Sequence, residues 1–179
     1  QCEPVKYWMH TNMLTVNGVR MSKSAGNGFL PMELFSGNHP ILEKGYSPMA
    51  VKFFMLQTHY RSTLDFSDDS LQAAEKGYRK LMNGFRTLNS LRYEENSSAV
   101  NEKINDEILK TCRQCPEAMN DDFNTAVVLS GLFSLLKHIN SFKSGVQDLS
   151  CLKRDVFDTM KSTFTVYTQG ILGLKDEGI

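Results

Sequence analysis

The chain has 179 residues, 41% hydrophobic and 22% charged, which is the composition of a globular protein with a sizeable core. Its 20 basic and 20 acidic side chains cancel, so no overall field draws it to nucleic acid, and contact with a polyanion must come from a local patch. No apolar run reaches the ~20 residues of a bilayer span, so we expect no membrane partner.

The first third of the chain predicts a small α/β unit. Asn17-Gly18 is the pair best suited to a type I′ turn, and the stretches MLTV and VRM on either side of it predict a β-hairpin. A glycine-rich loop follows at 22–28, and residues 29–46 are predicted to be irregular because glycine and proline interrupt them. We expect Trp8, the only tryptophan, to pack behind the hairpin.

Two helices are predicted next. Ser47 and Pro48 are typical of an N-cap and a first helical residue, and the helix is expected to run through Tyr60. A short linker, RSTLDF, leads to Ser67, a second N-cap, after which apolar residues recur at steps of three and four. That stripe predicts a long bundle helix whose buried face carries Leu71, Ala74, Tyr78, Leu81, Phe85 and Leu88.

The polar face of the long helix has two interpretations. It carries Lys76, Arg79, Lys80, Arg86 and Arg92. Such charges most often form a solvated face. Arg79 and Arg86, seven residues apart, share a side of the helix and could instead follow the backbone of a nucleic acid.

The remaining sequence predicts further helices. The polar stretch YEENSSAVNEK indicates a flexible connection, three apolar stripes follow it, and NDDFNTA supplies caps for the most apolar of the three. Together these segments predict a mainly α fold, an antiparallel bundle of four or five helices behind a small α/β lead-in that carries the hairpin and loop.

The four cysteines are scattered through the chain. Their spacing makes no disulfide framework, which favours a reducing, cytoplasmic compartment. Cys112-x-x-Cys115 would suit zinc on a tight turn beside a second pair, but here it falls on an apolar stripe with Ile104 and Ile108. We therefore predict that the pair is buried as small hydrophobic side chains and that this chain holds no metal.

The run RMSKS, residues 20–24, has the composition of an anion-binding loop. Lys23 can place a point charge on a phosphate, while the hydroxyls of Ser22 and Ser24 and the loop amides donate hydrogen bonds. A lone Lys-Ser pair would usually be a solvated turn. The full run, directly after a hairpin and before a glycine-rich stretch, favours a phosphate-binding loop.

RMSKS resembles the signature loop of class I aminoacyl-tRNA synthetases, usually written Lys-Met-Ser-Lys-Ser. Four segments in order, YWMHTNMLTVNGVRMSKSAGN, FFMLQTHYRSTLDFS, MNDDFNTAVVLSGLFSLLKHIN and ILGLKD, are similar to the cysteinyl-tRNA synthetase family. The resemblance implies a parent enzyme that activates cysteine with ATP and Mg²⁺ to cysteinyl-adenylate and then acylates tRNA(Cys). We also expect a monomer.

The resemblance assigns roles to the loop residues. Lys23 matches the second lysine of the motif and is the implied catalytic residue, while Arg20, Met21, Ser22, Lys23 and Ser24 are implied to bind ATP. Arg20 keeps the charge of the family's first lysine but not its compact ammonium. Farther on, PMAVKFF aligns with the family segment PDALRFF, and Lys52 stands in place of its arginine.

Other parts of the family's active site are not found in this sequence. The four histidines form no His-x-Gly-His element, and the family's zinc ligands lie upstream of Gln1. After ILGL, where the family continues into a small anticodon-reading domain, only KDEGI follows. We expect residues 1–62 to be the end of the catalytic domain with the loop and a connecting fold, residues 63–179 to be a tRNA-binding helical bundle, and the chain alone to be inactive.

Two other functions remain open at this point. One is a non-catalytic helical module that binds RNA or another protein. The other is a related cysteine ligase that acts on a small amine. The DDFNTA and HYRS segments favour the tRNA enzyme.

Overall fold

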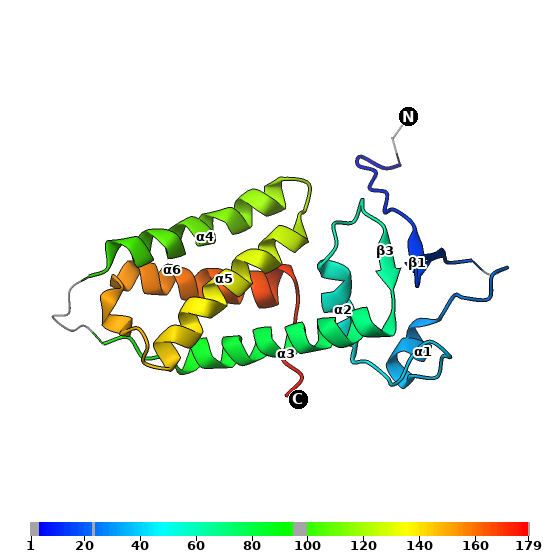
Figure 1. The fold of residues 1–179 in the computed structure, drawn as a ribbon. Coiled ribbons are helices and arrows are strands. Elements are labelled where there is room, and N and C mark those ends of the chain that lie inside the picture. The colour runs from blue at the N-terminus through cyan, green and yellow to red at the C-terminus, as the bar shows by residue number, and fades with distance from the viewer. Residues whose placement is uncertain (1–3, 23, 95–99, 179) are drawn as a thin grey trace.

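The computed structural model describes residues 4–22, 24–94 and 100–178, and it shows a small N-terminal unit at one end of a helical bundle (Figure 1). The N-terminal unit contains strands β1 (Leu14–Val16), β2 (Val19–Arg20) and β3 (Leu64–Phe66) and helices α1 (Pro31–Ser36) and α2 (Pro48–Leu56). The bundle contains helices α3 (Asp68–Ser90), α4 (Glu102–Asn120), α5 (Thr125–Lys143) and α6 (Arg154–Thr165), which continues as a π-helical turn, Val166–Ile171. The predicted fold class is confirmed.

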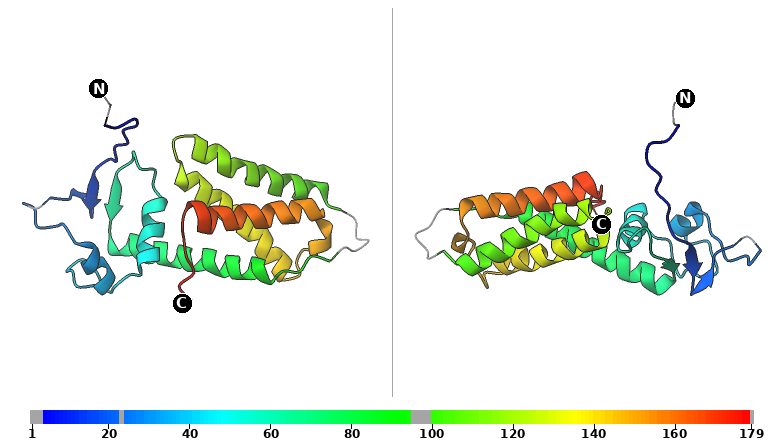
Figure 2. Two further views of the ribbon diagram at one scale, coloured as in Figure 1. Left: turned by 180° about the vertical axis from the view of Figure 1, so that it is seen from behind. Right: turned by 90° about the horizontal axis from the view of Figure 1, so that it is seen from above.

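The long helices form where the apolar period predicted them. Leu71, Ala74, Leu81 and Leu88 are buried along α3, and Phe85 is partly buried against the same core. α3 packs against α2 and α5, while α4 packs against α5 and α6, so one continuous core runs through the bundle (Figure 2). Among the described residues no helix combines the length and apolarity that crossing a membrane takes.

The predicted caps are present and explain where the helices begin. The hydroxyl oxygens of Ser47 and Ser67 accept hydrogen bonds from the backbone amides of Ala50 and Ser70, at 3.1 and 3.2 Å. Asn124 does the same for α5, accepting from the amide of Val127 at 3.2 Å. Each cap satisfies one of the first amides of a helix, which have no partner within the helix itself.

Close approach between helices depends on two glycines of α3. A β-carbon built at Gly84 would lie 2.0 Å from Cδ1 of Leu136 on α5, and one built at Gly77 would lie 2.9 Å from Cε1 of Phe53 on α2. A side chain at either position would force its neighbour to shift, so the two glycines let α3 lie close to α2 and α5 at once.

Three local predictions were wrong. Residues 29–46 contain α1, and the RSTLDF linker contains β3, which pairs in parallel with β1. Both are too short for a periodic signal. α2 ends at Leu56, four residues before the predicted end. The Leu56 carbonyl, which a longer helix would use within itself, instead accepts a hydrogen bond from the Thr125 hydroxyl of α5 at 2.8 Å.

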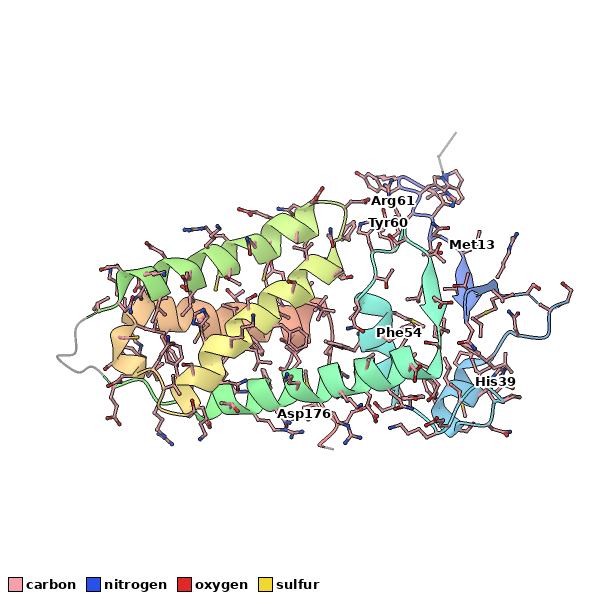
Figure 3. All side chains as sticks on the ribbon, in the orientation of Figure 1. Met13, His39, Phe54, Tyr60, Arg61 and Asp176 are labelled. Carbon is pink, nitrogen blue, oxygen red and sulfur yellow. The ribbon has the colours of Figure 1, made fainter. Side chains whose placement is uncertain are left out.

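The segment His59–Arg61 joins the lead-in to the bundle at Asp122, in the turn between α4 and α5 (Figure 3). The Tyr60 hydroxyl donates to Asp122 Oδ1 at 2.6 Å, Arg61 Nε lies 2.7 Å from Asp122 Oδ2, and His59 Nε2 donates to the Asp122 carbonyl at 3.0 Å. Asp122 and Phe123 both have a φ of 57°. This left-handed geometry is strained for an aromatic residue, and the contacts on Asp122 hold it in place.

The C-terminal segment crosses back over α2 of the N-terminal unit and α3 of the bundle. Lys52 Nζ donates to the Gly173 carbonyl at 2.9 Å, the Tyr78 hydroxyl donates to the Lys175 carbonyl at 2.6 Å, and Arg86 pairs with Asp176. Leu172 and Leu174 are buried. ILGLKD is thus a strap that closes the bundle, and Lys52 of the PMAVKFF segment holds its end.

Cys112 and Cys115 are buried in the bundle, as the apolar stripe predicted. Burial raises the pKa of the Cys115 thiol to about 11, and it also raises the pKa of Cys112. Both side chains are therefore neutral at physiological pH and pack as apolar groups.

We expect the Asp122 contacts to stabilise the fold measurably. Tyr60→Phe and Asp122→Gly each remove one partner, and glycine suits the positive φ of residue 122. Either change alone already breaks the hydrogen bond between Tyr60 and the charged carboxylate, so the double variant loses nothing further from it. The double-mutant cycle should therefore show a coupling of about 1 kcal/mol in the free energy of unfolding, measured in urea. The same cycle with Tyr60→Phe and Glu117→Ala, an exposed residue of α4, should show no coupling. Equal values in both cycles would contradict the structural role.

The buried thiols should resist modification in the folded protein. In a Cys2→Ser background at pH 8, a soluble aromatic disulfide should react with the half-buried Cys151 first, and with Cys112 and Cys115 only after unfolding. Because the Cys115 pKa is raised above that of a free thiol, its contribution to stability should be present below about pH 9 and be lost as the pH rises towards 11. Rapid labelling of all three thiols in the folded state would show that the pair is not part of the core.

Candidate functional site

The hairpin of the lead-in forms a fixed base for the 20–24 loop. Asn17 and Gly18 have φ values of 50° and 77°, the positive angles that a type I′ turn requires. Asp65 of β3 holds this turn, because its Oδ1 accepts from the Gly18 amide at 2.8 Å and from the Thr15 hydroxyl at 2.6 Å. The turn is therefore fixed to the sheet.

The loop that leaves β2 is closed by a single side chain, Asn27. Its Oδ1 accepts from the Ser22 amide at 3.0 Å, and its Nδ2 donates to the Arg20 carbonyl at 3.1 Å. The Met21 amide donates to the Leu14 carbonyl of β1 at 3.0 Å. The two ends of the loop are thus joined to each other and to the sheet.

The predicted site residues lie together on this loop. The hydroxyls of Ser22 and Ser24 are 3.3 Å apart, and Ser22 Oγ also accepts from the Ala25 amide at 3.1 Å. Arg20 is exposed at the end of β2 and forms no ion pair with any residue that the structure describes. Lys23, the predicted catalytic residue, lies outside the described residues.

A hollow of about 480 Å³ opens beside the loop. It is lined by Met21, Ser22, Gly26, Gly28, Phe29 and Leu30. Phe29 itself is fixed, because its ring meets Phe66 of β3 edge to face at 5.0 Å between ring centres. The hollow therefore has an apolar wall and a polar edge that carries the serine and the loop backbone, a combination that suits a ligand with an apolar ring and an anionic group.

The lead-in exposes several large apolar side chains. Trp8 is 73% exposed, so the prediction that it packs behind the hairpin was wrong. Other exposed apolar residues of this unit are Tyr7, Met9, Leu14, Val19, Leu30 and Met32. Exposed apolar side chains in this number are more than a lead-in packed on its own core would leave, and they suit contact with a partner.

The roles of Asn27 and Asp65 could not be seen in the sequence. Asn27 lies in a glycine-rich loop, and the sequence gives no sign that its amide group both donates and accepts across the turn. Asp65 lies 47 residues from Gly18, and no local pattern links the two. Within the described ranges, His, Cys, Asp and Glu side chains nowhere gather in a group of three that could hold a metal ion.

Two family models match different parts of the chain. Residues 1–76 match tRNA synthetases class I (C) catalytic domain, and residues 116–175 match the DALR domain. The first match covers the hairpin and the loop, and the second covers α5, α6 and the strap.

Curated relatives match over nearly the whole chain. It is 49% identical to a cysteine–tRNA ligase of Cytophaga hutchinsonii over 98% of this chain and 35% of the relative. It is 44% identical to a cysteine–tRNA ligase of Bacteroides fragilis, over 97% of this chain and 33% of the relative, and 39% identical to one of Porphyromonas gingivalis over the same shares. The chain thus spans about a third of the length of these relatives. In sequence, the chain is therefore similar to about one third of a class I cysteine–tRNA ligase.

Proposed function

We propose that this chain provides the signature loop and the helical bundle of a cysteine–tRNA ligase. The longer enzyme would activate cysteine with ATP to give cysteinyl-adenylate and pyrophosphate, and then transfer the cysteinyl group to tRNA(Cys). The observation that carries the proposal is the RMSKS loop, which Asn27 closes beside an open hollow.

The loop residues suit the charge that activation creates. As the cysteine carboxylate attacks the α-phosphorus, the bond to pyrophosphate breaks and negative charge grows on the leaving phosphates. Lys23 and Arg20 would place positive charge there, and the hydroxyls of Ser22 and Ser24 would donate hydrogen bonds. Mg²⁺ bound with ATP would supply further charge neutralisation.

The exposed apolar side chains of the lead-in support a partner that packs beside the loop. Trp8, Met9 and Leu30 lie on the same unit as the loop, and a catalytic nucleotide-binding fold packed on them would bring ATP to Lys23. We propose that residues 1–62 work with such a fold and that residues 63–179 hold tRNA. The zinc that the resemblance implies would be bound by other residues of the longer enzyme.

The role of Lys23 can be tested in the full-length protein. Lys23→Ala should lower the rate of cysteine-dependent ATP–pyrophosphate exchange by roughly 10²–10³ while leaving the KM for cysteine nearly unchanged, because the charge that it stabilises grows in the transition state. Lys110→Ala, which removes an exposed lysine of α4, is the control and should not alter exchange. An unchanged exchange rate in Lys23→Ala would refute the phosphate role.

Asn27 should act by positioning the loop. Asn27→Ala removes both hydrogen bonds that join the loop ends, so the exchange rate should fall by about 10–100-fold through misplacement of the loop. The melting temperature should change little, since the side chain is outside the core. Asn38→Ala, an exposed asparagine just after α1, is the matched control. If both variants behaved like the unmodified protein, the closure of the loop by Asn27 would have no role in activation.

A further inference from the structure

Charge is distributed unevenly over the bundle, although the chain is neutral overall. Residues 76–90 of α3 and all of α5 contain six basic side chains and not one acidic residue. The six are Lys76, Arg79, Lys80, Arg86, Lys137 and Lys143. α3 and α5 pack directly against each other (Figure 1), and all six of these basic side chains are exposed.

A hollow of about 560 Å³ lies between these two helices. Lys76, Arg79, Lys80 and Asn83 line it from α3, and Phe133 lines it from α5. The ring of Phe133 is held edge to face against Phe53, with ring centres 6.3 Å apart. The hollow therefore combines a fixed apolar wall with several cationic side chains, which are features of nucleic-acid surfaces.

The cations of this hollow are not equivalent. Arg79 is paired with Glu75 at 3.0 Å, and Arg86, farther along α3, is paired with Asp176. Lys76 and Lys80 are exposed and enter no ion pair with any residue in the described ranges. They are four residues apart, so they are neighbours on the helix surface, with β-carbons about 6 Å apart.

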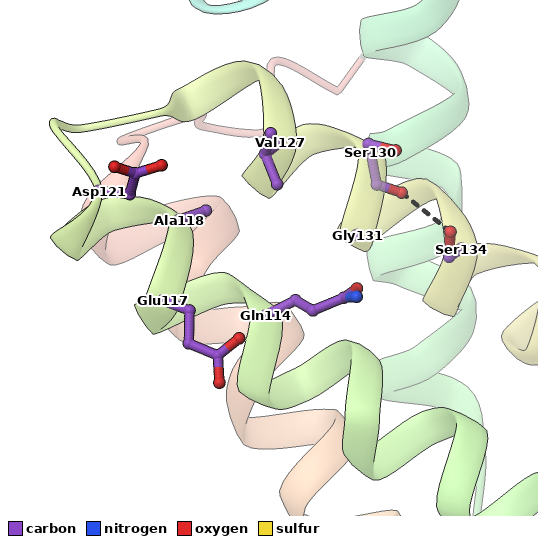
Figure 4. A pocket seen from close by; sticks show the side chains of 8 residues that line it. All are labelled: Gln114, Glu117, Ala118, Asp121, Val127, Ser130, Gly131 and Ser134. Atoms are coloured by element: carbon purple, nitrogen blue, oxygen red, sulfur yellow. Dashed lines mark hydrogen bonds between the residues drawn. The ribbon is translucent and has the colours of Figure 1, made fainter.

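The other side of α5 has the opposite character. A hollow of about 460 Å³ between α5 and the C-terminal half of α4 is lined by Glu117, Asp121 and Gln114 from one side and by Ser130 and Ser134 from the other (Figure 4). The described residues that line it include no basic side chain. A polyanion that approaches the bundle would thus be repelled from this groove and attracted to the one beside α3.

We propose that the hollow between α3 and α5 receives the phosphate backbone of tRNA, with Lys76 and Lys80 as the principal contacts. The inference rests on the proposed function, because tRNA is the polyanion that a cysteine–tRNA ligase must hold. Lysine ammonium groups act as point charges on phosphates and read no sequence, so this surface would position the tRNA and not select it. The Phe133 ring would provide an apolar wall for a ribose.

Charge reversal in the full-length protein tests the proposal. The variant Lys76→Glu/Lys80→Glu should raise the KM for tRNA about ten-fold or more, and the dependence of log Kd on log salt should become shallower by about 0.7–0.9 for each phosphate that the protein no longer neutralises. Cysteine-dependent ATP–pyrophosphate exchange should be unchanged. Lys76→Arg/Lys80→Arg should retain binding. The matched control, Lys110→Glu/Arg113→Glu, makes the same charge change on exposed residues of α4 and should leave the KM for tRNA as it was.

The outcomes separate this surface from the proposed function. Normal exchange with an unchanged tRNA KM and salt slope in Lys76→Glu/Lys80→Glu would overturn the surface and leave the ligase assignment standing. If the unmodified protein showed no cysteine-dependent exchange, the ligase assignment would fail, and direct binding of a tRNA transcript by the two charge-reversed variants would decide the surface. Polyglutamate can serve as a probe for an acidic protein partner. If Lys76→Glu/Lys80→Glu lost polyglutamate binding but kept tRNA binding, the surface would be one for an acidic protein, and the proposal would be overturned.

Discussion

The arrangement of the molecule depends on α3, which is one continuous helix shared by the lead-in and the bundle. Its 23 residues span about 34 Å. Its first turns are tied to the lead-in: the Tyr46 hydroxyl donates to the Asp68 carboxylate at 2.7 Å, and Lys44 pairs with Glu75. Its later turns are buried among α5 and α6. The contacts of Asp122 with His59–Arg61, of Thr125 with Leu56 and of Gly173 with Lys52 join the two parts at further points and fix their orientation about this helix.

The long helices could be predicted from sequence because their stability comes from a stripe that repeats over many residues. The stripe on α3 and the caps at Ser67 and Asn124 are local signals, and each agrees with the packed structure. The end of α2 could not be predicted in this way. Residues after Leu56 have an acceptable helical pattern, and the Asp122 contacts that draw them out of the helix come from a segment more than 60 residues away.

The candidate loop shows the same division between local and distant causes. Its composition and its place after an Asn-Gly hairpin predicted a phosphate-binding role, and the turn geometry follows from the two residues themselves. The closure by Asn27 depends on a backbone path that the sequence does not determine. Support of the turn by Asp65 requires β3, a strand of three residues that forms only because β1 is already beside it. Short elements of this kind are consequences of the tertiary fold and carry little signal of their own.

The two grooves beside α5 carry opposite local charge in a molecule with zero formal charge. Exposed charges are largely screened beyond a Debye length of about 8 Å at physiological salt, so these grooves act on a polyanion only at close range. Under the proposal that the groove beside α3 receives tRNA phosphates, a phosphate backbone that comes this close is attracted at one groove and repelled at the other. Charge would therefore set the orientation of a bound polyanion and contribute little to the rate at which it arrives.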